Sequence, residues 1–225
     1  MIGILLALQV NNWNESKKLL ETEIQIYKEI HSELEETLND LEDDKHDIQH
    51  SFNASLIVRD IIVKGEFNTD SLLKYLPEVF DLEQSHPKSS AFESLKSQGL
   101  TILSNDSLRH KITTLYQLSI PSLVNSDVVV ENAKFRNKIY PLLEPYLVVD
   151  RNQVVNDRNS DSFAWSRKLE RINIIDQDKF LKDELLLLTL QKSLSWRGMV
   201  IKLHEMVIKE INQVLKEIKD EIDHL

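Results

Sequence analysis

The chain has no cysteine, only four glycines and five prolines among 225 residues, and few aromatic residues (7%). Without cysteine there are no disulfides, thiol nucleophiles or Cys-based zinc sites, although both a reducing cytoplasm and a bacterial periplasm remain compatible. So little glycine and proline excludes collagen-like and low-complexity classes and argues against sandwiches and barrels, which need many turns. We therefore predict a mostly helical chain with the composition of a soluble domain.

Signatures of catalysis are missing as well. Gly3, Gly65, Gly99 and Gly198 lie too far apart to form a glycine-rich phosphate loop. Neither a Gly-x-Ser-x-Gly elbow nor a His-Glu-x-x-His pair occurs. We predict a protein that is not an enzyme and that holds no cofactor.

The charge balance argues against nucleic-acid binding. Lys and Arg number 27 and Asp and Glu 37, so the net charge is 27 − 37 = −10, and no basic patch is segregated. Residues 90–116 have the outline of a helix-turn-helix, but three basic or partly basic residues, Arg109, His110 and Lys111, are too few on such an acidic chain, and a plain helix corner explains them better. Residues 33–47 carry eight acids against the single Lys45, which is typical of a solvated helix face.

The amino terminus is apolar from Met1 to Val10 apart from Gln9, and then turns polar around Trp13. Ten helical residues reach about 15 Å, whereas a bilayer core is about 30 Å thick, so this stretch is too short to span a membrane. It also lacks the basic leader and cleavage site of a signal peptide. Residues 1–13 are either the second half of a membrane helix or an apolar helix end buried in the bundle. Trp13 occupies the position of a membrane-interface anchor.

Residues 3–15, GILLALQVNNWNE, resemble the GILIALQINNWNE signature of a family of single-pass membrane proteins from Bacteroidetes-type bacteria. A second block, residues 90–99 and 103–109, is similar to the same family. The resemblance implies a helical domain that faces the periplasm from the cytoplasmic membrane, and it brings no known activity. The family signature is preceded by a basic stub and half of a membrane helix, whereas this sequence begins inside the signature. Either the start was chosen late or this member has lost its anchor.

Residues 14–64 are predicted to form one long helix, or two helices that meet without a break, because Gly and Pro are absent from Ile4 to Lys64. Gly65 marks the end of this helical segment. Its heptad seam, the stripe expected to face other helices, consists of Leu20, Ile24, Tyr27, His31, Leu34, Leu38, Leu41, Lys45, Ile48, Phe52, Ser55, Arg59 and Ile62. The polar members His31, Lys45 and Arg59 recur every fourteen residues. They either set the register or oligomeric state, or extend their long side chains to solvent from the edge of a wide face.

Shorter helices are expected over residues 70–140. Ser90 and Glu93 have the spacing of a capping box, and Gly99 stands where a left-handed helix terminator belongs. Asn105 and Asp106 start the next helix, which Pro121 kinks or divides. Further boundaries are expected from a cap at Thr69 or Asp70 and from Pro77, Pro141 and Pro145.

Residues 149–176, rich in Asn and Asp where they begin, are predicted to be a loop. Within this region, residues 147–149 and 154–155 are short β-prone runs that we expect to pair as a hairpin.

The last helix is predicted over residues 178–224, with only Gly198 interrupting it. Its seam consists of Ile201, His204, Ile208, Ile211, Leu215, Ile218, Ile222 and Leu225, flanked by Val200, Val207 and Val214. This face is wide enough to pack against two neighbours. We predict an all-α fold in which residues 14–225 form one domain, an elongated antiparallel bundle of the long first and last helices with capped short helices between them.

Two sets of residues were weighed as sites. His46 and His50 with Asp43 and Asp47 share a helix face that is chemically suited to Zn²⁺, yet they lie at outer heptad positions with no second helix to complete the site. A solvated face is therefore the preferred interpretation, and no metal site is predicted. His204 on the last seam is expected to be a partnered core histidine or an interruption of the seam rather than a ligand, and a carboxylate partner across the bundle is a hypothesis for it.

In the second family-like block, Glu93, Lys96, Asn105 and Arg109 are candidate contact residues. The competing interpretation, which we favour, makes Glu93 and Asn105 helix caps and leaves the two cations on exposed faces.

For function, the first hypothesis is a non-enzymatic, membrane-tethered domain that acts through protein or envelope contacts, with the bilayer as partner of the amino-terminal segment. A ligand-sensing periplasmic bundle and a soluble cytoplasmic scaffold are the alternatives. Homo-oligomerisation stays open, and the protein partner is unknown.

Overall fold

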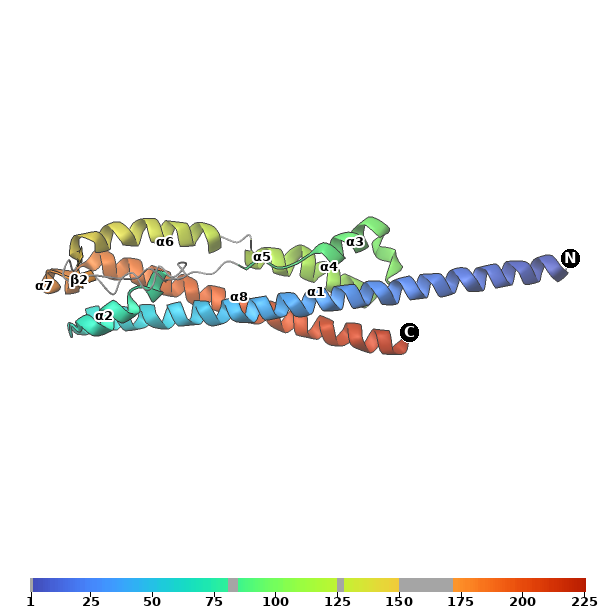
Figure 1. The fold of residues 1–225 in the computed structure, drawn as a ribbon, viewed down its shortest axis with the longest axis horizontal. Helices are drawn as coiled ribbons and strands as arrows, with labels where there is room; N and C mark the ends of the chain where they lie inside the picture. Colours follow the sequence, from blue (N-terminus) through green and yellow to red (C-terminus); the bar gives the residue numbers. More distant parts are fainter. Residues whose placement is uncertain (1, 81–84, 125–127, 150–171) are drawn as a thin grey trace, which may run out of the picture. The chain divides into compact units, whose positions relative to one another are not determined.

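A computed structural model describes residues 2–80, 85–124, 128–149 and 172–225 (Figure 1). The predicted all-α class is confirmed, and the only strands within these residues form one short pair. The chain forms two compact units. Unit 1 comprises Met1–Glu42, Ser85–Val124 and Glu205–Leu225, and unit 2 comprises Asp43–Gln84 and Asn125–His204.

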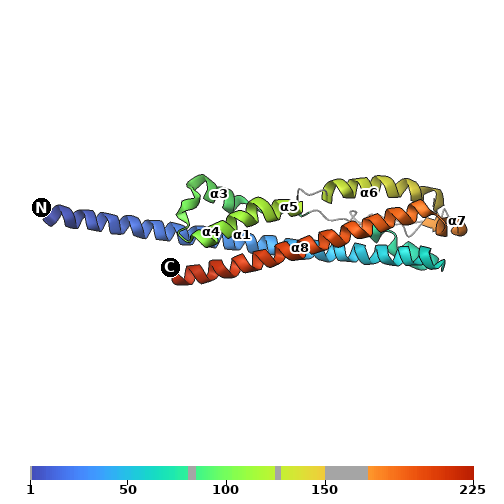
Figure 2. The same cartoon turned by 180° about the vertical axis from the view of Figure 1, so that it is seen from behind.

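Both units are built on the two long helices, α1 (Ile2–Lys64) and α8 (Glu184–His224). Helix α1 ends where predicted, because Gly65 adopts a φ of 68° that other residues rarely take. In unit 2, Phe52 meets Gly198 and Ser55 meets Arg197, so that rising numbers on α1 meet falling numbers on α8. The predicted antiparallel packing of the first and last helices is therefore confirmed (Figure 2).

Unit 1 adds short helices beside these two. They are α3 (Ser90–Gln98), a 3₁₀ turn (Leu100–Ile102), α4 (Asp106–Thr114), a π-helical turn (Leu115–Ser119) and α5 (Ile120–Val124). Gly99 ends α3 with a φ of 106°, as its position predicts, although its ψ of 123° is not that of a left-handed helix. The π turn is closed by a hydrogen bond from Ile120 N–H to the Leu115 carbonyl. It accommodates Pro121, whose ring and missing N–H disturb the regular hydrogen bonds of the helix.

Unit 2 contains α2 (Thr69–Tyr75), a 3₁₀ turn (Glu78–Phe80), α6 (Val128–Leu143), a second 3₁₀ turn (Glu144–Tyr146), β1 (Leu147–Val149), β2 (Ile172–Ile174) and α7 (Gln177–Leu181). The cap of α2 is Asn68, whose side chain accepts a hydrogen bond from Ser71 N–H, and not Thr69 or Asp70 as expected. A core of Val58, Leu72, Ile139, Phe180 and similar side chains unites these elements with α1 and α8.

The predicted hairpin of residues 147–149 with residues 154–155 concerns a region that the structure describes only in part. β1 pairs antiparallel with β2, with Val148 opposite Asn173, whereas residues 154–155 lie outside the described residues. Ile172 and Ile174 give β2 the period-2 alternation of a strand, but a run of only three residues is too short to predict a strand from the sequence.

The buried stripe of α1 differs from the predicted seam. One predicted row is buried from Tyr27 onward, every seventh residue, through Leu34, Leu41, Ile48, Ser55 and Ile62. The other predicted row, which carries His31, Lys45 and Arg59, is only half-buried throughout. The second buried row lies one residue earlier and consists of Glu23, Ile30, Thr37, Ser51 and Val58. The three recurring polar residues therefore lie at the edge of the buried face.

On α8 the predicted face is largely confirmed. Residues Val200, Ile201, His204, Val207, Ile211, Val214, Leu215 and Ile218 are buried, and the helix becomes exposed only near its end.

Candidate functional site

Two features of unit 1 frame the site. One is a junction of buried carboxylates and helix ends, and the other is the exposed start of α1. At the junction, Glu33 on α1 is 6% exposed. Its carboxylate accepts hydrogen bonds from Ser90 Oγ and from the backbone N–H of Ala91, both at 2.7 Å. A carboxylate at a helix start satisfies free N–H groups and complements the helix dipole. Glu33 therefore caps α3 from another helix.

The other oxygen of Glu33 holds Tyr116 of the π turn, whose hydroxyl donates to it at 2.8 Å. Burial raises the pKa of Tyr116 well above its ordinary value, and the negative charge and hydrogen bond of Glu33 raise it further. The Tyr116 ring stacks on Phe92 of α3, with centroids 4.6 Å apart and planes 3° from parallel. One carboxylate thus connects α1, α3 and the π turn.

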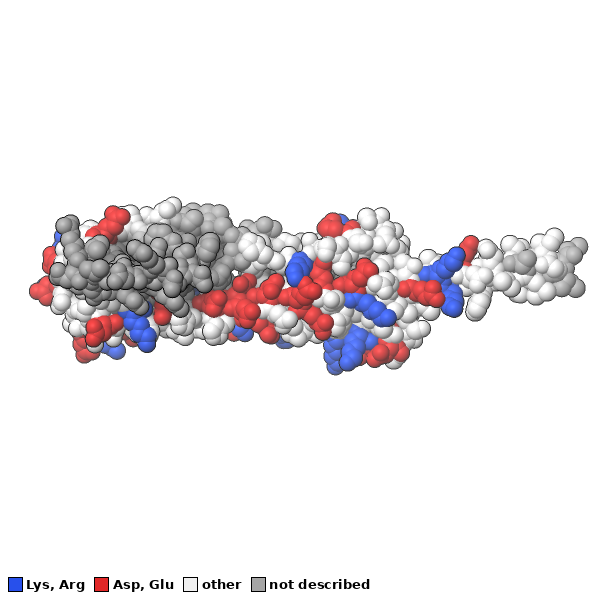
Figure 3. Space-filling view, in the orientation of Figure 1, with Lys and Arg blue, Asp and Glu red and all other residues white. Residues whose placement is uncertain are grey.

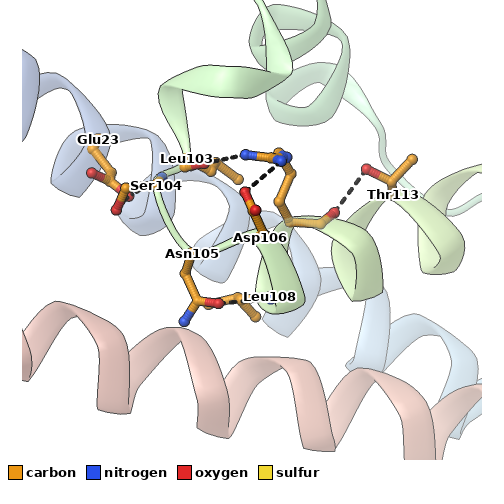
Figure 4. A network of polar contacts seen from close by, with 8 residues as sticks. Glu23, Leu103, Ser104, Asn105, Asp106, Leu108 and Thr113 are labelled. Atoms are coloured by element: carbon orange, nitrogen blue, oxygen red, sulfur yellow. Dashed lines mark hydrogen bonds and ion pairs between the residues drawn. The ribbon is translucent and has the colours of Figure 1, made fainter.

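A second buried carboxylate of α1 binds the bend between the 3₁₀ turn and α4. Glu23 accepts hydrogen bonds from the backbone N–H and the hydroxyl of Ser104, at 2.7 and 2.8 Å (Figure 4). Burial raises the pKa of the neighbouring Tyr27, and the charge of Glu23 adds to this. Glu33 therefore attaches the start of α3 to α1, and Glu23 attaches the bend before α4 to α1.

Asn105 is the N-cap of α4, as predicted. Its side-chain oxygen accepts from Leu108 N–H at 3.1 Å, and its amide nitrogen donates to Glu221 of α8 at 2.6 Å. Arg109 donates to the Leu103 carbonyl at 2.8 Å and pairs with Asp106 at 2.6 Å. In Figure 4 these groups converge on the bend before α4. Both residues are thus engaged within the unit.

The expected capping box is wrong. The N-cap of α3 is Ser89, which makes no side-chain cap bond, and Ser90 donates to Glu33 instead. Glu93 pairs with Lys96 on the exposed side of α3 at 2.9 Å. Local spacing suggested the box, but a carboxylate from another helix occupies the position that Glu93 was expected to fill.

The start of α1 projects from the junction as what we call the apolar tip, residues 2–13. Every described side chain from Gly3 to Leu19 is exposed, before burial begins with Glu23. The exposed fractions include Ile4 69%, Leu6 56%, Leu8 54%, Val10 57% and Trp13 66%. Figure 3 shows no red or blue atoms on the described part of this end, up to a cluster of charged side chains further along the helix. Large apolar side chains, Ile4 and Leu8 on one side and Leu6, Val10 and Trp13 on the opposite side, are therefore left uncovered by the described residues.

Among the described residues, no helix is both long and apolar enough to cross a membrane.

The residues considered for metal binding are dispersed. His46 contacts Asp47 at 3.4 Å on an open surface, and His50 instead faces Glu78 at 3.7 Å. Asp43 is exposed and joins neither contact. Within the described ranges, no group of three or more His, Asp or Glu side chains is placed to hold a metal ion.

His204 lies in the core of unit 2 with 2% exposure, and its Nδ1 lies 2.9 Å from the Val200 carbonyl. Burial lowers its pKa, whereas the hydrogen bond to Val200 and the charge of Asp44 act in the opposite direction. The charge of Lys45 lowers the pKa as well, and a carboxylate partner across the bundle stays a prediction.

A buried cation was missed in the sequence. Arg197 of α8 is fully buried, and its guanidinium donates to Ser55 Oγ at 2.8 Å, Ser193 Oγ at 2.5 Å and the Val79 carbonyl at 2.5 Å. It also lies over the Phe135 ring, 5.1 Å from the centroid. The sequence feature that could have indicated this buried cation is the presence of small hydroxyl residues facing the last helix.

Comparison with protein-family models, with curated proteins and with solved structures found no match. The arrangement itself therefore carries the functional argument. The polar groups of the junction bind one another, and the apolar tip is the feature that internal packing leaves unexplained.

Proposed function

We propose that the protein is a non-enzymatic, membrane-tethered helical domain, whose apolar tip enters a lipid bilayer and whose remaining surface acts through protein or envelope contacts. The observation that carries the proposal is the exposure of large apolar side chains on two opposite sides of the tip. A helix with apolar side chains on more than one face belongs in a protein core or a membrane. Burying each large apolar side chain is worth about 1.5–3 kcal/mol, so leaving a series of them in water is costly.

As the second half of a membrane helix, the tip would cross one leaflet. Residues 2–10 span about 14 Å as a helix, which is close to half of a bilayer core of about 30 Å. Trp13 then lies at the level of the headgroups, where its ring has both apolar and polar surroundings. The polar turns up to Leu19 keep the junction clear of the lipid.

The proposed location is the outer face of a bacterial cytoplasmic membrane. It rests on the resemblance of residues 3–15, 90–99 and 103–109 to the family of single-pass membrane proteins described above.

Flotation with neutral phosphatidylcholine vesicles tests the tether. The chain should float with the vesicles, and the variant I4S/L8S should remain at the bottom of the gradient. Leu19→Ser is the matched control, because Leu19 is also exposed (63%) but lies beyond the polar turns. Flotation that is equal in all three proteins, or absent in all three, would overturn the proposal.

Trp13 gives an independent readout of depth. The fluorescence of the native chain minus that of Trp13→Phe isolates this ring from Trp165 and Trp196. Vesicles should shift the difference spectrum to the blue, and quenchers near the headgroups should act more strongly than quenchers at the bilayer centre. An unshifted spectrum in vesicles that bind the chain would place the contact elsewhere.

Ligand sensing is the second candidate. A hollow of about 250 Å³ lies between α4 and α8 of unit 1, above Leu115 and Val214, with His110 and Glu210 at its rim. Its volume falls just below the range of about 300–1,000 Å³ that is usual for small-molecule sites. A bound small molecule should raise the melting temperature of the native chain and leave that of Thr114→Trp, which fills the hollow, unchanged.

A further inference from the structure

Unit 2 has an open groove between its two long helices. A hollow of about 450 Å³ runs between α1 and α8, with Phe52, Leu56, Gly198 and Met199 among its lining residues. Phe52 and Leu56 are half-buried, and Met199 is 58% exposed. Its apolar side chains come from both helices, as in hydrophobic grooves that bind a further helix.

Gly198 is the unusual feature of this groove. Glycine inside a helix weakens it relative to alanine. A Cβ at position 198 would lie 3.7 Å from Cε2 of Phe52, which is an ordinary contact. Internal packing therefore does not require glycine here. The missing side chain opens the groove and lets another backbone come close to α8.

The charge of the groove is opposite to that of the chain. Its charged lining residues are Arg59 and Lys202, and the lining contains no acid, although the whole chain carries a net charge of −10. The Arg59 guanidinium binds Asp60 outside the lining, at 2.5 Å. Lys202 forms no ion pair with any residue that the structure describes.

The two cations lie near opposite ends of the groove. Ser55 meets Arg197, so Arg59 lies level with about residue 193 of α8, and Lys202 is about nine residues, or 13 Å, further along. Two to three helical turns cover this distance.

From these observations we infer that the groove binds an acidic amphipathic α-helix of a partner protein. Its apolar face rests on Phe52, Leu56 and Met199, its backbone approaches Gly198, and carboxylates seven to eleven positions apart reach Arg59 and Lys202. Long flexible side chains such as Met199 can adapt to the apolar face of the partner. The inference rests on the part of the proposed function that assigns protein contacts to this domain, and it does not depend on the tether.

Selection from a displayed library of 20-residue amphipathic helical peptides tests the inference on the full chain without lipid. Two flanking positions, seven to eleven residues apart, vary among Asp, Glu, Lys, Arg and Ser. Peptides with acids at both positions should be enriched. The charge-reversed chain R59E/K202E should instead select Lys or Arg, and K202E alone should remove the preference at one position.

Gly198→Met fills the groove without changing its charge and should reduce the affinity for the selected peptides at least tenfold, with an unchanged circular dichroism spectrum. The matched control is Lys192→Glu, an exposed change on α8 outside the lining, which should select the same acidic peptides as the native chain.

Three results would overturn the inference. They are a library without enrichment over an unrelated protein, binders without acidic preference, and equal binding to Gly198→Met. A chain that sediments as a dimer, and as a monomer after Gly198→Met, would assign the groove to a second copy instead. Vesicle flotation is measured separately, so a failed tether and a failed groove are distinguishable.

Discussion

Glu33 on α1 accepts a hydrogen bond from the backbone N–H of Ala91, a residue 58 positions further along the chain, at 2.7 Å. The first turn of α3 is thus capped by a side chain from another helix. The stability of the short helix α3 therefore depends on its contact with α1, because the cap forms only when the two helices pack together.

The first prediction concerns this cap. Glu33→Gln should lower the free energy of unfolding by about 2 kcal/mol, because a charge-assisted hydrogen-bond acceptor is lost. In addition, the new amide nitrogen, which is a donor, faces one of the groups that donate to Glu33 in the native chain. Urea denaturation followed by circular dichroism measures the change.

The control for Glu33 is Glu35→Gln. Glu35 is 59% exposed and only approaches His31, at 3.5 Å, so its change should stay within about 0.5 kcal/mol. Equal effects of the two substitutions would contradict the assignment of Glu33 as a cap.

The second prediction separates the two hydrogen bonds of Asn105. Asn105→Ala removes the cap of α4 and should cost about 1 kcal/mol. Asn105→Asp keeps an acceptor for Leu108 N–H but places a carboxylate against Glu221, so it too should destabilise, and high salt should reduce its effect. Loss of partner binding in Asn105→Ala with an unchanged melting temperature would instead support a direct contact role.

The helices themselves were predictable because their signals are local. Gly65 and Gly99 stand at helix ends, Asn105 caps α4, and the apolar period of residues 200–218 matches the buried face of α8. In each case the residue that carries the signal lies in or beside the element that it defines.

The second buried row of α1 was not predictable by the same means. It contains Glu23, Thr37 and Ser51, which hydrophobicity assigns to the surface. Glu23 is buried because it binds the backbone N–H of Ser104, 81 positions away. Arg197 is buried because hydroxyl and carbonyl groups from other elements of unit 2 accept hydrogen bonds from its guanidinium. Tertiary packing determines these partners, and apolar spacing does not reveal them. A prediction based on apolar spacing therefore assigned the neighbouring row to the buried seam.

The third prediction is a pH dependence from His204. Burial lowers its pKa in the folded chain below the value of about 6.5 of an exposed histidine. The unfolded chain therefore binds more protons below pH 6.5, and the stability that this residue confers declines as the pH falls through that value. Between pH 7.5 and 5, the urea midpoint of the native chain should fall more than that of His204→Leu.

The control for His204 is His46→Gln, because His46 is exposed (81%). This variant should reproduce the pH dependence of the native chain. If His204→Leu did the same, the titration would have to be assigned to other groups.

The fourth prediction compares two glycines. Gly198→Ala should stabilise the chain by about 0.5–1 kcal/mol, because alanine favours the helix and its Cβ finds an ordinary contact with Phe52. Gly99→Ala should destabilise the chain by about 1 kcal/mol or more, because a φ of 106° is strained for any residue with a Cβ. Thermal unfolding of the two variants should therefore shift in opposite directions. A loss of stability in Gly198→Ala would show that packing does require glycine there, and the open groove would then be a consequence of the fold alone.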